Sequence, residues 1–129
     1  MRGSERRGWE KLLKGAGKNR LGNAARPTVV DGIRFASRLE ADRYRELKLL
    51  QLAGQVAYTV RQVPFVVATG VVYRLDFLVV WNRTGTHREV VTHEDCKGHL
   101  TEVSKIKIRA VEDRYGIKIQ LLTRKDVSR

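Results

Sequence analysis

The stretch from Val71 to Gly98 constrains the fold more than any other part of the chain. Its first half, V-V-Y-R-L-D-F-L-V-V-W, is an almost unbroken apolar run that contains one acid, Asp76. A polar turn, N-R-T-G-T, follows, and the second half, H-R-E-V-V-T-H-E-D-C-K-G, ends in Asp95 and Lys97. Two β-rich runs joined by a short polar turn predict a pair of neighbouring strands.

Strand geometry predicts how the charged residues of this pair lie. Side chains alternate along a strand, so Asp95 and Lys97 share one face, while Glu94 and Cys96 point to the other. An acid inside a buried strand costs free energy unless its charge is compensated. A second acid beside it adds like-charge repulsion. Because a divalent cation between Asp76 and Asp95 would remove both costs, the pattern predicts a metal site.

The ligand types indicate which cation and which chemistry. The carboxylates of Asp76 and Asp95, with the backbone carbonyl of Cys96, supply the hard oxygen ligands that Mg²⁺ prefers. A Mg²⁺-bound water is a good nucleophile, and Lys97 can stabilise negative charge on a phosphate or hold and deprotonate that water. The spacing D-x(18)-D-x-K therefore predicts phosphodiester hydrolysis. The alternative is a simple Asp95–Lys97 ion pair, which contributes little if it is exposed.

The formal net charge of +12 indicates a polyanionic partner, nucleic acid before membrane. Residues 1–26 carry eight Lys or Arg against two Glu and are broken up by glycines. We interpret them as a basic, flexible arm that contacts DNA phosphates, with a solvated tail as the alternative. The candidate phosphate ligands in this arm are Arg6, Arg7, Lys11, Lys14, Lys18 and Arg20. Residues 27–129 are expected to form the nuclease domain.

Length and cysteine content set further limits. A chain of 129 residues is expected to form one domain. It has no apolar stretch as long as a membrane span, so no membrane partner is expected. The single cysteine, Cys96, excludes an internal disulfide and favours the reducing cytoplasm.

The remaining segments predict a small α/β domain. V-V-D-G-I-R-F, from Val29 to Phe35, has the Asp-Gly signal of a β-hairpin. A helix is expected from Ser37 to about Ala53 and a strand over Gln55 to Gln62, with Pro64 marking a break or a sheet edge. A second helix over Glu102 to Tyr115 and a strand over Ile117 to Leu122 complete the domain. This order predicts a single domain with a mixed β-sheet flanked by helices.

Several basic residues of the domain are further candidates for DNA binding. Arg74 lies two positions before Asp76 and so on its face, where it can touch a phosphate or pair with an acid. Lys105, Lys107 and Arg109 lie at the start of the second predicted helix, where phosphate contact is natural. A solvated charged face is the alternative for these three residues.

The motifs also resemble a known family. Asp76…Asp95-x-Lys97, with a glutamate on the preceding helix, resembles the PD-(D/E)XK nuclease superfamily. The segments V-D-G-I-R-F-x-S-x-x-E-A-x-R-Y, Q-x-P-F, Y-x-x-D-F and E-D-x-K-G-x-x-T-E are similar to those of small phage-encoded nucleases related to Holliday-junction resolvases. The resemblance covers about Thr28 to Arg124. No proline precedes the first acid, and Cys96 replaces an aliphatic residue, but neither departure removes a ligand.

This resemblance implies both a fold and an activity. The fold is an αβββαβ restriction-endonuclease-like core with a leading β-hairpin. The activity is that of a Mg²⁺-dependent, structure-selective DNA endonuclease, with Mn²⁺ as a second candidate ion. Such a protein introduces paired nicks in four-way DNA junctions as a homodimer, is phage-encoded and acts in the cytoplasm of a bacterial host. Two alternatives stay open: a less selective phage or repair nuclease for flaps, nicks or duplexes, and a non-catalytic nucleic-acid-binding protein.

The resemblance also assigns site residues. It implies Asp76 and Asp95 as metal ligands, Lys97 as the catalytic lysine and Glu40 as the helix carboxylate that completes the site. Ser37 and Gln62 are implied as accessory residues. Glu40 has a structural alternative, because Ser37-x-x-Glu40 is a capping box in which the glutamate accepts a hydrogen bond from the N-cap amide.

Overall fold

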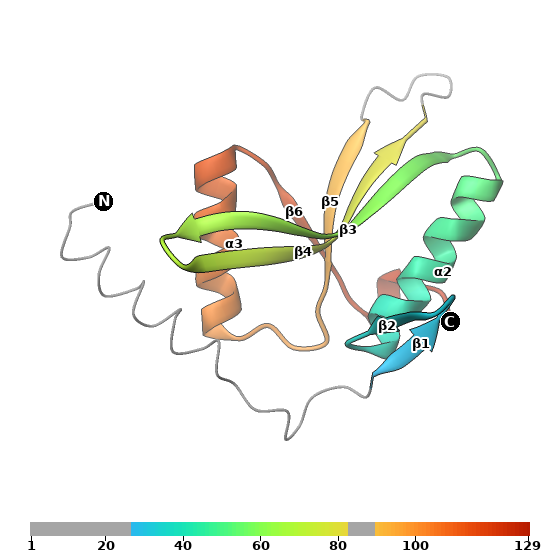
Figure 1. The fold of residues 1–129 in the computed structure, drawn as a ribbon, viewed down its shortest axis with the longest axis horizontal. Coiled ribbons are helices and arrows are strands. Elements are labelled where there is room, and N and C mark those ends of the chain that lie inside the picture. Colours follow the sequence, from blue (N-terminus) through green and yellow to red (C-terminus); the bar gives the residue numbers. More distant parts are fainter. Residues whose placement is uncertain (1–26, 83–89) are drawn as a thin grey trace.

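The computed structural model describes residues 27–82 and 90–129. The predicted arm, residues 1–26, and residues 83–89 of the predicted turn and second strand lie outside the described residues. Figure 1 shows the elements, which are β1 (Thr28–Val30), β2 (Ile33–Phe35), α2 (Arg38–Leu52), β3 (Val56–Ala68), β4 (Val71–Trp81), β5 (Val91–Cys96), α3 (Glu102–Tyr115), β6 (Ile119–Leu122) and a 3-10 helix, η1 (Arg124–Asp126).

The predicted α/β fold is confirmed. Strands β3, β4, β5 and β6 form one sheet in that order, and β1 and β2 form a separate two-stranded hairpin. The β3–β4 and β4–β5 pairs are antiparallel and the β5–β6 pair is parallel, so the sheet is mixed. From α2 to β6 the order of elements is αβββαβ, with the hairpin in front. No helix within the described ranges is long and apolar enough to cross a membrane.

Local sequence signals set several element ends. Asp31 and Gly32 have φ angles of 53° and 75°, the left-handed conformation that a tight Asp-Gly turn between antiparallel strands requires. The side chain of Ser37 caps the start of α2. Gly54, with φ 81°, follows the C-cap residue Ala53 and lets the chain leave the helix.

Strand β3 is longer than predicted. The expectation that it ends at Gln62 was wrong, because β3 runs through Pro64 to Ala68, with Pro64 opposite Arg74 of β4. The missing N–H of Pro64 is tolerated because β3 lies at the edge of the sheet, where one side of the strand has no ladder to complete.

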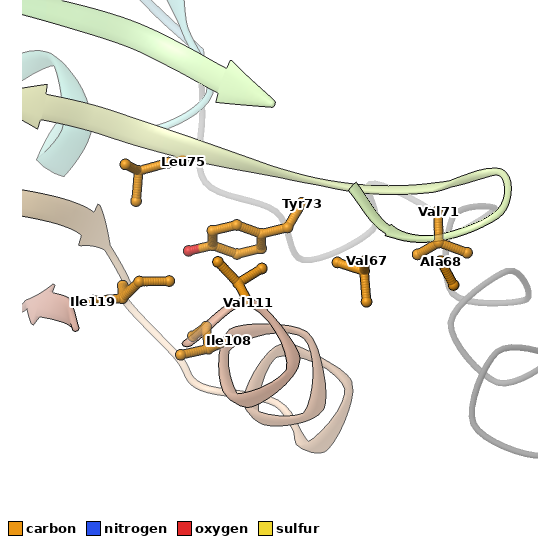
Figure 2. Close-up of a cluster of buried hydrophobic side chains, with 8 residues drawn as sticks. All are labelled: Val67, Ala68, Val71, Tyr73, Leu75, Ile108, Val111 and Ile119. Atoms are coloured by element: carbon orange, nitrogen blue, oxygen red, sulfur yellow. The ribbon is translucent and has the colours of Figure 1, made fainter. Parts of the chain in front are cut away.

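Two apolar clusters share strand β4. The cluster under α3 contains Val71, Tyr73 and Leu75 of β4, and Figure 2 shows the Tyr73 ring close to Val111 of α3. The cluster under α2 contains Phe77 and Val79 instead. The ladder between β4 and β5 begins only at Phe77, which pairs with Glu94. Strand β4 therefore leaves β5 and passes from one cluster to the other at Asp76.

Candidate active site

Three carboxylates from three elements meet where β4 leaves β5. Glu40 comes from the first turn of α2, Asp76 from β4 and Asp95 from β5. Glu40 raises and Asp95 lowers the pKa of Asp76, so both carboxylates lie near that of Asp76. Glu40 and Asp95 are buried, with exposed fractions of 5% and 2%. The structure thus brings together the three acids that the sequence and the resemblance single out.

Asp76 is held by two donors from neighbouring strands. Its Oδ2 accepts a hydrogen bond of 2.8 Å from the backbone N–H of Cys96, and its Oδ1 accepts one of 3.4 Å from the Gln62 side chain. The carboxylate bonds the Cys96 N–H at the point where the β4–β5 ladder has ended. Gln62 has φ 53°, a conformation that a non-glycine residue in a strand adopts at a cost in free energy. This distortion lies at the contact with Asp76, which supports a functional role for the site.

Asp95 is held by a phenol and an ammonium. Its Oδ2 accepts a hydrogen bond of 2.5 Å from the Tyr73 hydroxyl and lies 3.2 Å from Nζ of Lys97. Glu94 turns to the opposite face and binds Arg43 of α2, in agreement with strand alternation. Sequence reasoning missed Tyr73, which reads as an ordinary core residue in the apolar run of β4.

Burial raises the pKa of both aspartates. Burial is the largest cause for Asp76, and contact with Glu40 raises its pKa further, against the lowering effects of Asp95 and of the Cys96 N–H. Burial also raises the pKa of Asp95, as does contact with Asp76, while Lys97 and Tyr73 lower it. Negative charge is therefore crowded at this point, and a bound cation would relieve the crowding.

Glu40 lies in the first turn of α2, where the sequence left a helix-capping role and a site role as alternatives. Its backbone N–H donates to Oγ of Ser37 at 3.1 Å, as expected at a helix start. The capping-box prediction was wrong in one respect, because Oε2 of Glu40 accepts from the N–H of Ala36 at 3.3 Å rather than from that of Ser37. The same carboxylate also contacts Asp76. The helix start therefore fixes the position of a candidate site residue.

Comparison with protein families gives this arrangement a context. A family model described as Protein of unknown function (DUF1064) matches residues 21–125. The chain belongs to the DUF1064 family. The match covers every element from β1 to β6 and all three carboxylates. A search of curated proteins found no match. The family description names no activity.

A buried ion pair fixes α2 against β5 beside the site of the DUF1064 protein. Nε and Nη2 of Arg43 donate to the two carboxylate oxygens of Glu94 at 2.8 and 2.6 Å. Arg43 also contacts Glu46, one turn further along α2. Burial alone would lower the pKa of Arg43, but its bonds to Glu94 and Glu46 raise it. Because Arg43 follows Glu40 by one helical turn, the pair holds Glu40 in place against the sheet.

Replacing Arg43 with Met should destabilise the protein by about 3–5 kcal/mol, because it leaves the Glu94 carboxylate buried without a partner. Urea unfolding of wild type and variant measures this loss. Arg45→Met is a matched control, since Arg45 is exposed and its partner Asp42 keeps a second ion pair with Arg124. The free energy of unfolding of the control should fall by less than about 1 kcal/mol. Equal losses in both variants would show that the Arg43–Glu94 pair has no special role.

The donor set fits a Mg²⁺ ion bound mainly through two aspartates. Within residues 27–82 and 90–129, no group of three or more His, Cys, Asp or Glu side chains is arranged to hold a metal ion. Mg²⁺ needs only one or two carboxylates, since it keeps several waters and takes further ligands from substrate phosphates. Asp76 and Asp95 supply that number, and burial is the largest cause of their raised pKa values. Ligation by Glu40 and by the backbone carbonyl of Cys96 stays a prediction.

The predicted DNA-binding residues of the domain lie at several places on its surface. Arg74 is exposed on β4, Arg109 is exposed on α3, and Lys107 of α3 is half-buried. Lys105 is exposed and forms an ion pair of 3.0 Å with Glu102. The arm candidates Arg6, Arg7, Lys11, Lys14, Lys18 and Arg20 lie outside the described residues.

Proposed function

We propose that the DUF1064 protein is a Mg²⁺-dependent DNA endonuclease that selects branched DNA, with the four-way junction as its first candidate substrate. The observation that carries this proposal is the meeting of Asp76, Asp95 and Lys97 at the point where β4 leaves β5. The net charge of +12 supports a polyanionic substrate. Junction preference and paired nicking by a homodimer rest on the resemblance to the PD-(D/E)XK nucleases.

In this proposal Asp76 and Asp95 hold the metal. A Mg²⁺ ion bound there supplies an activated water and offsets negative charge on the phosphate that is attacked. The Cys96 N–H and the Gln62 side chain orient the Asp76 carboxylate from two strands. Tyr73 and Lys97 orient the Asp95 carboxylate. Both carboxylates are thus fixed by the fold before a substrate arrives, as a catalytic site requires.

Lys97 is placed to act on the substrate. Its side chain is 27% exposed, so that the ammonium can contact both Asp95 and a phosphate at the surface. Phosphodiester hydrolysis places additional negative charge on the phosphate oxygens in the transition state. A fixed ammonium in a partly dehydrated site stabilises this charge more strongly than water does.

Cleavage of synthetic DNA by the full-length protein tests the proposal. A four-way junction, a flap and a linear duplex of shared sequence are incubated with Mg²⁺ or with EDTA. We expect two symmetric nicks in the junction, no products in EDTA and slower cleavage of the other substrates. Equal rates on all three substrates would identify a less selective nuclease. Binding without cleavage in either Mg²⁺ or Mn²⁺ would contradict the proposal and identify a non-catalytic nucleic-acid-binding protein.

A further inference from the structure

Arg61 of β3 carries a charge that the described protein does not neutralise. Its guanidinium lies over the Phe35 ring, 4.3 Å from the ring centre. Its Nε is buried and has no hydrogen-bond partner. The side chain as a whole is half-buried, and Arg61 forms no ion pair with any carboxylate of the described residues.

Two other arginines show what the fold otherwise does with a shielded guanidinium. Of the arginines in the described ranges, only Arg43, Arg61 and Arg124 are not exposed. Arg43 binds Glu94 with two hydrogen bonds, and Arg124, whose Nε is also buried without a hydrogen-bond partner, binds Asp42 through Nη1 at 2.9 Å. A positive charge that is partly removed from water costs free energy unless an anion accompanies it. Arg61 has only the face of Phe35, so its remaining donors are available to an anion from outside the protein.

Two residues beside Arg61 lead to the candidate active site: Phe35, on which it stacks, and Gln62, which follows it in β3. Phe35, on which Arg61 stacks, is followed by Ala36, whose N–H donates to Glu40. Gln62, the next residue of β3, donates to Asp76. A ligand bound by Arg61 would therefore lie beside the segments that position two of the three carboxylates.

We infer that Arg61 binds a backbone phosphate of the nucleic-acid strand that enters this site. The guanidinium is a planar fork of donors whose geometry matches two phosphate oxygens. Stacking on Phe35 fixes the plane of this fork. The inference rests on the proposed function, because the strand is the proposed substrate. Sequence reasoning did not single out Arg61, which reads as an ordinary polar position in a strand.

DNA binding by the full-length protein in EDTA, without cleavage, tests this inference. Fluorescence anisotropy with a labelled four-way junction gives the affinity over a series of salt concentrations. Arg61→Gln should weaken binding on the order of tenfold and reduce the slope of log affinity against log salt by about one. Arg61→Lys keeps the charge and should largely keep the slope, but it should still bind more weakly. Lys118→Gln removes one exposed charge just before β6 and should stay close to wild type.

The outcomes separate this inference from its rivals. Wild-type affinity and salt slope in Arg61→Gln would overturn it, while the cleavage assay would still decide the proposed function. Thermal unfolding without DNA tests a purely structural role, since a lower melting temperature with an unchanged salt slope would also overturn it. If Arg61→Gln does not fold, Arg61→Lys decides, and wild-type affinity in that variant would overturn the inference. If the wild-type protein binds DNA through Arg61 but does not cut it, the proposed function is contradicted and the inference about Arg61 stands.

Discussion

Replacing Asp95 with Asn should reduce junction cleavage on the order of 10³-fold or more, and Asp76→Asn should do the same. Each substitution keeps the size of the side chain but removes one of two negative charges available to Mg²⁺. The amide oxygen can still accept from the Tyr73 hydroxyl at position 95 or from the Cys96 N–H at position 76, so the surrounding strands should keep their positions. Single-turnover cleavage at saturating protein measures the chemical step, and anisotropy in EDTA should show nearly unchanged junction binding.

The same Asn variants should be more stable than wild type when no cation is present. The pKa of Asp76 is raised to about 6 and that of Asp95 to about 7, with burial as the largest cause. A carboxyl whose pKa is higher in the folded than in the unfolded state stabilises the fold at low pH, and this contribution is lost as the pH rises through the folded-state pKa. We therefore expect a gain of roughly 1–3 kcal/mol for Asp95→Asn at about pH 8, which disappears at about pH 4.

Urea unfolding in EDTA at the two pH values measures this gain. Asp113→Asn, at an exposed position of α3, is the control. It should show neither the gain in stability nor the loss of cleavage. Mg²⁺ should stabilise wild type at the higher pH and leave Asp95→Asn nearly unchanged. Asn variants that cut normally would show that the assignment of the site is wrong, whatever their stability.

Short-range signals in the sequence were sufficient to predict the leading hairpin and the face of β5 on which Asp95 lies. The Asp31–Gly32 pair predicted the leading hairpin because both residues adopt positive φ angles there. Alternation along β5 separated Asp95 from Glu94, and the structure places Glu94 on Arg43. These predictions succeed because turn conformation and strand alternation depend on neighbouring residues only.

The contacts that the sequence did not predict depend on how β4 bends. Alternation says that Tyr73 and Leu75 share a face, but not which part of the molecule that face meets. Because β4 leaves β5 at Asp76, this face turns toward α3 and the Tyr73 hydroxyl reaches Asp95. Sequence spacing also predicted the wrong amide for Glu40, whose carboxylate accepts from the N–H of Ala36 and not from that of Ser37.

Replacing Lys97 with Met should lower the cleavage rate about 10²- to 10³-fold at saturating protein, while junction binding in EDTA changes little. The methionine keeps the length of the side chain but removes the ammonium that lies 3.2 Å from Asp95. Since Lys97 lowers the pKa of Asp95, its loss should also move the acidic limb of the pH–rate profile to higher pH.

Two further variants show how Lys97 acts. Lys97→Arg keeps the positive charge but, with a guanidinium, cannot take up a proton at neutral pH. Substantial activity in this variant would indicate that Lys97 stabilises charge in the transition state, whereas a loss as large as in Lys97→Met would indicate that it holds or deprotonates the attacking water. Lys125→Met, at an exposed position in η1, controls for the loss of one charge and should cut normally. Normal cleavage by Lys97→Met itself would reduce the Asp95–Lys97 contact to a simple ion pair and leave the carboxylates as the candidate catalytic groups.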